Sequence, residues 1–439
     1  MWQLSSPNEH DMQKSRYRLH LLWQYFKSVW LPDNKTTMPM PNRMSVLDNL
    51  RIVLFGLLIL HHIGMFYSLN WGWHAKSTHR SEWLESLLLI VEPWRMPAIW
   101  LISGIAIRFI LAKLSIIKFV ILRSYRLLLP LLFGVLIVVP PQLYVEMTAN
   151  GDISMSFWQF MHAFYQPNHP LFENYQAGIW PHIDVNHLWY LRSLWYYSLY
   201  LVILLPLLNS RITSNISDWF SKQPGMLFIA TLIAAVLAIQ LIWQDGETRY
   251  PIGFMFLVLG YLIGWHTVFW EKLGQHLKLL GLCYLLISAL VILGYNTYWL
   301  HDNKLPALDI TMLTIYSCAR VVGLLLILSI ACNYFSKSTP IWRYLTPAVF
   351  PFYILHQTII LTAGWWLTQQ GLPVVIEVPL LVGVTFIGCW LGFEIIRRID
   401  FLRPLFGMKV KQQYSNFSLR LGYMTAALAV TPLAAKLII

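Results

Sequence analysis

Long apolar runs alternate with short polar segments along most of this 439-residue chain. A helix needs about 20 mostly apolar residues to cross the ~30 Å hydrocarbon core of a bilayer. The chain offers ten such runs, and an eleventh is weaker because it carries Lys436 near its end. The pattern predicts an all-α integral membrane protein, a polytopic bundle of 10–11 transmembrane helices. The expected segments are 50–67, 86–110, 127–145, 187–209, 226–243, 251–270, 279–297, 311–334, 347–368 and 376–396, with 421–439 as the eleventh.

The composition supports the same fold class. Hydrophobic residues make up 57% of the chain and charged residues 12%, whereas a soluble domain carries about 25% charged residues. Because so few charges cannot cover a globule of this size, lipid must face most of the surface. The 21 tryptophans and 22 tyrosines suit the two membrane interfaces. The four cysteines all fall inside apolar runs, which argues against a disulfide framework in external loops.

Lysine and arginine residues gather on alternate polar segments. With the N-terminus placed in the cytoplasm, 23 basic residues fall on cytoplasmic segments, four on external segments and five within spans. Because membrane proteins keep an excess of basic residues in their cytoplasmic loops, we expect a cytoplasmic N-terminus. The net charge of +12 is then explained by loops that face anionic lipid, and it does not indicate a nucleic-acid partner.

The chain divides into three parts on this basis. Residues 1–44 form a cytoplasmic N-terminal segment, in which 16–30 favour a short amphipathic helix at the interface. Residues 45–400 form the transmembrane domain, and 401–439 add a basic cytoplasmic segment and the weaker eleventh span. The longest external loop, 146–186, has several aromatic residues and lacks lysine and arginine. A sugar-binding surface and an interfacial loop packed on lipid are equal alternatives for it.

Ionisable residues inside apolar runs are costly in hydrocarbon and therefore mark candidate sites. Arg51 opens the first span, and His62 follows eleven residues later. Eleven residues rise about 16 Å and make three turns plus about 20°, so the two side chains lie on one stripe of the helix. The pattern places a permanent cation at the cytoplasmic mouth and a titratable imidazole near mid-depth. The alternative for His62 is a structural hydrogen bond within a helix interface.

The second span carries a further group of polar residues. Glu92 and Arg95 are three residues apart, a spacing that favours an ion pair. Pro97 and Gly104 predict an irregular helix, which a membrane tolerates where the backbone lies in a protein-lined interior. The alternative is a structural ion pair near the outer interface.

Arginine and histidine residues recur on four later spans. Arg123 and Arg126 are one turn apart at the inner end of the third span and could clamp a phosphate. Taken alone, the two arginines are better explained by the excess of basic residues that membrane proteins keep on the cytoplasmic side. His187 stands at the outer start of the fourth span, Arg320 in the middle of the eighth and His356 in the ninth. Each fits a packing role equally well, but together they exceed what lipid-facing helices require.

The order of these residues resembles the membrane-bound acyltransferase-3 family. Leu47–Arg51 followed by His62 is similar to the family's Arg-X10-His signature, and Leu101–Gly104 resembles its Ser-Gly element in the second span. Ile99–Trp100 replaces the aromatic pair that the family usually has before that element, and the arginine cluster is sparse. Later landmarks of the family are matched by Arg123 and Arg126, by His187–Leu191 and by Tyr353–His356.

The resemblance implies an O-acyltransferase of a bacterial inner membrane. It would move an acyl group from cytosolic acyl-CoA to a hydroxyl of an extracytoplasmic glycan or glucan. Arg95-Met96 and the tail Glu394–Ile399 look closest to the branch that acylates periplasmic glucans. His62 would act as general base or acyl carrier, with Arg95 or Ser103 at the oxyanion. Arg51, Arg123 and Arg126 would bind the donor phosphates, and the substrate-side candidates are His187, Trp189, Arg320 and His356.

Two other classes of function remain as alternatives. A multi-pass transporter or flippase could use intramembrane histidine and arginine residues as relays, and it would show paired broken helices. A scaffold or sensor would consume no acyl-CoA. Among donors, acetyl-CoA and succinyl-CoA are both compatible with the sequence. No metal is expected, because the histidine and cysteine spacings do not resemble a zinc site. The expected partners are the lipid bilayer, acyl-CoA and a glycan acceptor, and the oligomeric state is undetermined.

Overall fold

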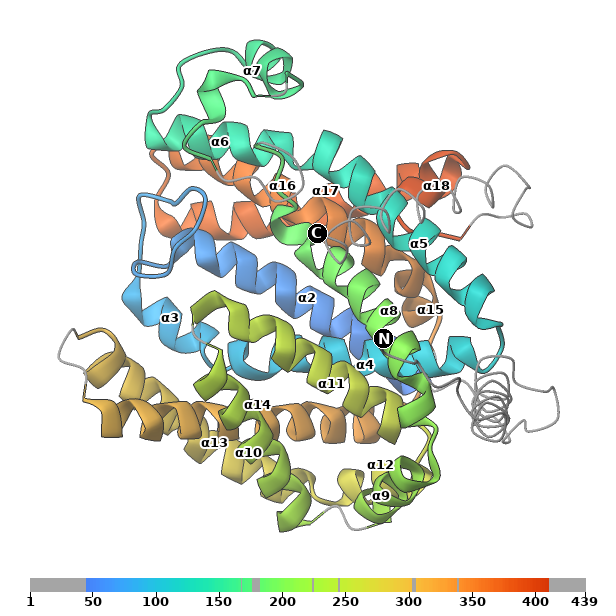
Figure 1. Ribbon diagram of the computed structural model, residues 1–439. Helices are drawn as coiled ribbons and strands as arrows, with labels where there is room; N and C mark the ends of the chain where they lie inside the picture. The colour runs from blue at the N-terminus through green and yellow to red at the C-terminus, as the bar shows by residue number, and fades with distance from the viewer. Residues whose placement is uncertain are drawn as a thin grey trace, which may run out of the picture.

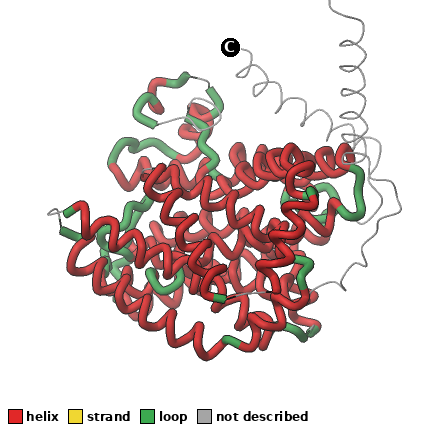
Figure 2. Tube along the Cα trace, turned by 60° about the horizontal axis from the view of Figure 1, so that its bottom comes forward, coloured by secondary structure: helices red, strands yellow, loops and turns green. Residues whose placement is uncertain are grey.

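The computed structural model describes residues 45–409, apart from 167, 176–181, 223–224, 244, 302–304 and 338. Helices make up most of this part of the chain (Figure 2), and Ser68 and Ser81 form an isolated β-bridge. The expected interfacial helix at 16–30 and the eleventh segment, 421–439, lie outside the described residues.

The helices follow one another along the whole described chain. The α-helices are α2 (Ser45–Tyr67), α3 (Glu82–Leu88), α4 (Glu92–Leu111), α5 (Ile116–Phe133), α6 (Pro140–Asn150), α7 (Phe157–Phe164), α8 (Trp189–Leu208), α9 (Arg211–Lys222), α10 (Met226–Ile242), α11 (Arg249–Ile263), α12 (Thr267–Gln275), α13 (Leu277–Gly294), α14 (Pro306–Tyr334), α15 (Pro340–Leu345), α16 (Val349–Thr368), α17 (Val374–Arg398) and α18 (Leu402–Leu405). Short 3₁₀ or π turns are η1 (Gly134–Val138), η2 (Pro170–Phe172), η3 (Asn186–Leu188), η4 (Asp245–Thr248), η5 (Tyr295–Trp299) and η6 (Thr346–Ala348).

The number of spans can be compared with the ten predicted apolar segments. Within the described residues, eight helical segments are long and apolar enough to cross a membrane. The bent pair α11 and α12, which meet at 108°, adds a ninth if it forms one span, and α10 is a shorter apolar helix. Each of the ten predicted segments lies on helix. The all-α polytopic membrane fold is therefore confirmed, and a count of ten spans requires that the bent pair and α10 also cross.

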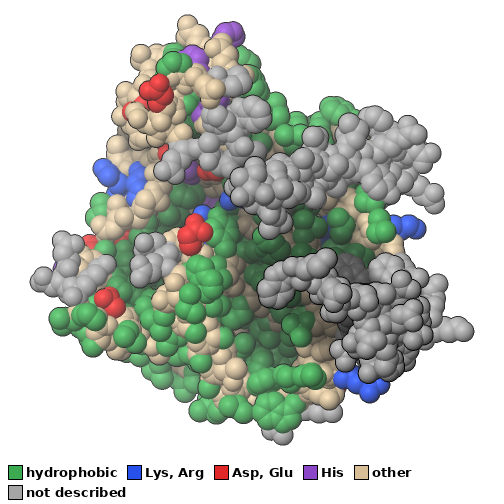
Figure 3. Space-filling view, in the orientation of Figure 1, with side chains coloured by type: hydrophobic (Ala, Val, Ile, Leu, Met, Phe, Trp, Pro, Cys, Tyr) green, Lys and Arg blue, Asp and Glu red, His purple; other side chains and the backbone are tan. Residues whose placement is uncertain are grey.

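Large apolar side chains remain on the outer surface of the bundle. Leu285 on α13 is 67% exposed and Ile387 on α17 is 58% exposed. Figure 3 shows hydrophobic side chains spread over much of the face in view, with few charges among them. A water-soluble protein does not leave such a surface exposed, so lipid must cover it.

Helix α2 occupies the middle of the arrangement. It packs against α16 on one side and α4 on the other, and α4 in turn packs closely against α11 (Figure 1). The closeness of α4 and α11 depends on two glycines, because a Cβ at Gly104 would lie 1.8 Å from the carbonyl oxygen of Leu257. A Cβ at Gly260 would lie 2.0 Å from the carbonyl oxygen of Leu101. The two backbones therefore touch at this point.

This contact corrects the expectation for the second span. Helix α4 runs without a break from Glu92 to Leu111 and includes Pro97. Gly104 is thus needed for close backbone approach and does not interrupt the helix. The Ser-Gly element anchors α4, which carries Arg95 and Ser103, against its neighbour.

The loops gather at two opposite ends of the bundle. Residues 68–81, α7 and the turn between α16 and α17 lie at one end, here called the α7 end (Figure 1). Helices α15 and α18 and the turn between α4 and α5 lie at the opposite end, the α18 end (Figure 1). This separation agrees with the predicted alternation of spans. The assignment of the α18 end to the cytoplasm stays a prediction from the basic residues.

The predicted external loop, 146–186, forms a small folded cap around α7. Phe160, Phe164 and Phe172 are buried together in a separate apolar cluster, and His182 stacks on Phe172. Burial and a hydrogen bond to Asp152 raise the pKa of Tyr175 to about 12. The phenylalanines of this loop thus pack on one another, whereas Trp158 is 79% exposed and Tyr165 is 49% exposed. The two alternatives for the loop, a sugar-binding surface and an interfacial loop packed on lipid, both stay predictions.

Candidate functional site

The arginines predicted to bind a donor come together at the α18 end. Arg51 of α2 and Arg123 and Arg126 of α5 line one cavity of about 490 Å³. Arg403 and Lys409, which follow α17 in the chain, complete the basic lining and were not singled out in the sequence. Their signal was the density of basic residues after residue 396. The charged residues around this basic cavity are Asp48, Arg51, Arg123, Arg126, Arg403 and Lys409.

The basic cavity is suited to an anion with several phosphate groups. Five cations face one carboxylate across its walls, so the cavity favours negative ligands. Arg123 donates from Nε to the hydroxyl of Ser198 at 3.1 Å, which holds the guanidinium in place. Arg403 is held by its own backbone surroundings, because it donates to the carbonyl of Arg397 at 2.8 Å.

A second, smaller cavity contains His62. It measures about 100 Å³ and is lined by His62 of α2, Arg95 of α4 and His187 of η3, together with apolar and aromatic residues. We call it the imidazole cavity. Both cavities share Phe55, Ile99 and Tyr190 as walls. The predicted stripe of α2 therefore leads from a basic cavity at Arg51 to an imidazole in the adjoining cavity.

Phe55 and Tyr190 line both cavities, and Tyr353 of the imidazole cavity packs against them. The rings of Phe55 and Tyr353 meet edge to face at 5.5 Å, and those of Phe55 and Tyr190 at 6.3 Å. Ser103 donates to the carbonyl of Ile99 at 2.8 Å, and its oxygen lies 2.6 Å from the hydroxyl of Tyr190. The structure thus places Ser103 on the basic cavity, where its proton is already used. Arg95, in contrast, lies beside His62.

His62 is paired with a second histidine. Its Nδ1 lies 2.8 Å from Nε2 of His356 on α16, and the two rings stack at 5.0 Å with 15° between their planes. His356 is fully buried, and its Nδ1 lies 2.7 Å from the carbonyl oxygen of Tyr353. The sequence indicated His62 as a catalytic candidate and His356 as a substrate-side candidate, but it did not indicate that the two rings touch.

Arg95 is buried without the expected partner. It is 5% exposed, and its Nε and Nη1 have no hydrogen-bond partner among the described residues. The predicted ion pair with Glu92 is wrong, because Oε2 of Glu92 is also buried without a partner in this part of the chain. A guanidinium in this state is costly to bury unless a negative group pairs with it.

His187 has no nitrogen left for a substrate. Its Nε2 donates to the carbonyl of Ile354 at 3.0 Å, and its Nδ1 accepts from Gln142 at 3.3 Å. Asn186, at φ 45°, turns the chain into η3 and places this ring beside α16. Trp189 lines the imidazole cavity, and Arg249 stacks over its ring at 5.1 Å. Of these two substrate-side candidates, His187 is therefore a structural link between η3 and α16.

Arg320 is not brought to either cavity. Its guanidinium donates to the side-chain oxygen of Gln240 on α10 and lies 4.9 Å above the ring of Tyr316. It stabilises the contact between α10 and α14. Arg192, another intramembrane cation, donates to the hydroxyl of Tyr250 at 3.3 Å and also lines neither cavity.

The sequence did not single out the loop 68–81, which covers His62 from the α7 end. The ring of Trp73 lies 5.1 Å from that of His62, and its Nε1 is buried without a partner among the described residues. The next residue, His74, pairs with Glu146 of α6 at 2.6 Å. The local signal was the sequence Trp-Gly-Trp-His at 71–74, dense in rings for an external loop.

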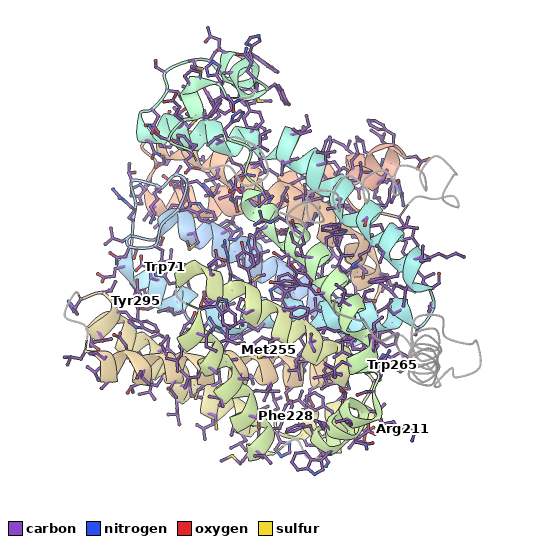
Figure 4. All side chains as sticks on the ribbon, in the orientation of Figure 1. Trp71, Arg211, Phe228, Met255, Trp265 and Tyr295 are labelled. Atoms are coloured by element: carbon purple, nitrogen blue, oxygen red, sulfur yellow. The ribbon has the colours of Figure 1, made fainter. Side chains whose placement is uncertain are left out.

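This loop is held firmly at both ends. At one end, Trp71 donates to the hydroxyl of Tyr295 at 2.9 Å, and Figure 4 shows these two residues together at the edge of the bundle. At the other end, Ser77 donates to the buried carboxylate of Glu377 at 2.8 Å. Between them, Lys76 donates to backbone carbonyls of the loop, and burial lowers its pKa. Trp73 is therefore fixed in position over His62.

A metal centre has no support in the described part of the chain. Its histidine, cysteine and carboxylate side chains do not form a group of three or more that could hold an ion.

Comparison with known proteins places the chain in a family. Residues 44–394 match the acyltransferase-3 model, described as an acyltransferase domain. The glucans biosynthesis protein C of Shigella dysenteriae serotype 1 is 27% identical over 200 residues, which cover 44% of this chain and 47% of that protein. Its counterpart in Escherichia coli K12 is 26% identical over the same shares. No solved structure shows a significant match.

The alignment with these curated relatives spans about half of their length. The family match is broader, since it covers α2 through most of α17 and includes both cavities except Arg403, Gly407, Met408 and Lys409. The extent of this match shows that the chain belongs to the acyltransferase-3 family of membrane proteins.

Proposed function

We propose that this protein transfers a short acyl group from acyl-CoA to a hydroxyl group of a glycan on the other side of the membrane. The observation that carries the proposal is the pair of adjoining cavities, one basic and one holding His62, with shared walls. The relatives named for glucan biosynthesis suggest a glucan as the acceptor.

The basic cavity would bind the donor. Coenzyme A carries several phosphate groups, and Arg51, Arg123 and Arg126 would hold them by charge-assisted hydrogen bonds. A cavity of about 490 Å³ lies within the usual range for ligand sites. The thioester would pass Phe55 and Tyr190 to reach His62, so these rings would form the passage between the two cavities.

The imidazole cavity limits the size of the acyl group. Its volume is about 100 Å³, smaller than an engineered cavity of about 150 Å³ that accepts benzene. A volume of this size favours a short acyl group, such as acetyl or succinyl, over a long fatty-acyl chain. Arg95 would face the developing oxyanion, or the carboxylate of a succinyl group.

The chemistry follows from His62. As a general base, it would take the proton of the acceptor hydroxyl while that oxygen attacks the thioester carbonyl. The carbon–sulfur bond then breaks, and the coenzyme A thiolate receives the proton from His62. If His62 instead carries the acyl group, its Nε2 attacks the thioester carbonyl and the coenzyme A thiolate leaves first. The hydroxyl oxygen then attacks the acyl-imidazole, the carbon–nitrogen bond breaks, and the hydroxyl proton passes to the thiolate. Both routes need His62 and the same two cavities.

The acceptor would approach from the α7 end. Trp73 lies against His62 on that side, and an indole offers a sugar an apolar face and one N–H donor. The pair His74–Glu146 lies next to it and is about one quarter exposed on each residue. We therefore assign the acceptor to the loop 68–81 and α6, in place of the earlier candidate His187.

The transporter alternative gains no support from the helices. It calls for paired broken helices around the substrate, whereas the described chain has one bent pair, α11 and α12. Neither helix contributes to the basic cavity or to the imidazole cavity.

The test uses membrane vesicles that contain the protein, labelled acetyl-CoA or succinyl-CoA, and a glucan fraction. Wild-type vesicles should label the glucan and release coenzyme A thiol. His62→Ala should abolish both signals, whereas His276→Ala, which removes a histidine remote from both cavities, should leave them unchanged. Equal labelling by His62→Ala and the wild type would remove His62 from the reaction.

A further inference from the structure

We propose that His356 is a positioning residue that fixes the ring and the tautomer of His62, so that Nε2 of His62 carries the reactive lone pair. The inference rests on the proposed function, because it concerns the imidazole to which that function assigns the chemistry. It follows from the hydrogen bonds of the two rings, taken atom by atom.

The proton on His356 is located by its backbone partners. Its Nδ1 lies 2.7 Å from the carbonyl oxygen of Tyr353 and 3.2 Å from that of Phe352. A carbonyl oxygen accepts hydrogen bonds and cannot donate them, so Nδ1 of His356 must carry a proton. In a neutral ring the other nitrogen, Nε2, then has a lone pair and acts as an acceptor.

This assignment determines the tautomer of His62. Its Nδ1 lies 2.8 Å from Nε2 of His356 and must supply the proton between them. A neutral His62 that is protonated at Nδ1 keeps its lone pair on Nε2. That nitrogen is the one able to accept a proton from a hydroxyl or to attack a thioester.

The opposite arrangement would require a charged His356. A doubly protonated ring could donate to Nδ1 of His62, but it would bury a cation in a fully buried residue, next to His62, which lines one cavity with Arg95. Among the described residues, the carboxylates that lie within ion-pair distance of a histidine contact His74, His79 and His266. Because His356 has no such partner there, the neutral ring is favoured.

The surroundings prevent His356 from rotating. Its ring meets that of His187 edge on at 5.3 Å. His187 is itself tied to α16, since its Nε2 donates to the carbonyl of Ile354 and its own carbonyl accepts from Tyr353 at 2.5 Å. Gln142 of α6 donates to the remaining nitrogen of His187. Residues of η3 and α6, which are distant from α16 in the sequence, thus hold the ring of His356 in the position from which it orients the ring of His62.

The arrangement also suits the reaction. When Nε2 of His62 takes the acceptor proton, the ring becomes an imidazolium, and its Nδ1–H still donates to His356. When the proton passes to the departing thiolate, His62 returns to the same tautomer. The hydrogen bond therefore persists through the cycle, and the enzyme does not have to reorganise the base at either step.

The test compares two substitutions at position 356. His356→Phe keeps the ring volume and removes the acceptor, whereas His356→Gln places an amide oxygen near the position of Nε2. We expect His356→Phe to lower kcat by about 10²–10⁴-fold, the range that general base catalysis contributes, with the KM for the acyl-CoA donor unchanged. His356→Gln should recover most of the lost kcat, because its oxygen can accept the proton of His62.

A chemical readout separates positioning from folding. Diethyl pyrocarbonate modifies the unprotonated nitrogen of imidazole, and mass spectrometry of the peptide with His62 measures the rate. His62 should react more slowly in His356→Phe than in the wild type, and at close to the wild-type rate in His356→Gln. Wild-type kcat in His356→Phe would overturn the inference. Equal loss of kcat in both variants, with a lower melting temperature in both, would also overturn it and assign His356 a structural role.

His62→Ala, measured in parallel, distinguishes a failure of the proposed function from a failure of the role given to His356. Full activity in His62→Ala contradicts the proposed function itself. An inactive His62→Ala together with a fully active His356→Phe leaves the function intact and removes His356 from it.

Discussion

At the scale of single residues, two arginines on α4, Arg95 and Arg108, differ in whether their guanidinium groups have hydrogen-bond partners. Arg108 donates to the carbonyls of Tyr261 and Leu262 at 2.7 and 2.9 Å and stacks against Trp265. Nε and Nη1 of Arg95 have no partner among the described residues. The first arginine stabilises the contact of α4 with α11, and the second costs free energy while these two nitrogens have no partner.

The contrast yields a prediction about stability and activity. Arg95→Met should leave the melting temperature unchanged or raise it, because it removes an unsatisfied buried cation. The same change should lower kcat by roughly 10²–10³-fold, the usual effect of losing an oxyanion donor. Thermal unfolding in detergent and acyl transfer with acetyl-CoA and succinyl-CoA measure the two effects.

Arg108→Met is the matched control. It should lower the melting temperature, because two carbonyl oxygens lose a charged donor. A clear loss of stability in Arg95→Met, with kcat retained, would contradict the role given to Arg95.

The sequence predicted the relations between residues on one helix, but not the contacts between residues on separate elements. Arg51 and His62 share one helix, so helical geometry alone predicted their alignment. The contacts of His187 and His356 depend on how η3 and α16 meet, which spacing along the chain does not encode. Trp73 was missed because a loop residue reaches His62 only through the anchors at Trp71 and Ser77.

At the scale of helices and loops, the contact between α4 and α11 determines where Arg95 lies. Gly104→Ala should destabilise the protein by about 1–3 kcal/mol, the usual cost of overpacking, because its Cβ would meet the carbonyl oxygen of Leu257 at 1.8 Å. Gly383→Ala on α17 is the control, since a Cβ there meets nothing within 4 Å. It should be neutral or stabilising by up to about 1 kcal/mol. Equal melting temperatures for the two variants would refute the close contact.

The loop 68–81 leads to a prediction about the acceptor. Trp73→Ala should raise the KM for the glucan about tenfold, a loss of about 1.4 kcal/mol in binding, and leave the KM for acyl-CoA unchanged. Steady-state kinetics with each substrate varied in turn measures both values. Trp83→Ala removes an exposed tryptophan from α3 at the same end, and it should change neither. A raised KM for acyl-CoA in Trp73→Ala would place Trp73 on the donor side.

The helices themselves were more predictable than their connections. All ten apolar segments lie on helix, because hydrophobic length is a local property of the chain. The bend of 108° between α11 and α12 was not anticipated. The segment 251–270 reads as one continuous apolar run, and the break at residues 264–266 follows from packing and turn geometry.

At the scale of the whole molecule, the two ends of the bundle differ in chemistry. The basic cavity lies toward the α18 end, and Trp73 and Glu146 lie toward the α7 end. His62 stands between them. Under the proposed function, this arrangement would let an anionic donor and a polyhydroxylated acceptor stay on opposite sides of the membrane while their reacting groups meet within the protein.

The most direct test of this account is a sidedness measurement in sealed proteoliposomes. Orientation is set by labelling Lys113→Cys at the α18 end with an impermeant maleimide, and labelled acyl-CoA and glucan are supplied on chosen sides. The account predicts that label reaches the glucan when the donor is on the α18 side and the glucan on the α7 side, and that His62→Ala abolishes it. Transfer only when donor and glucan share one side would contradict the account.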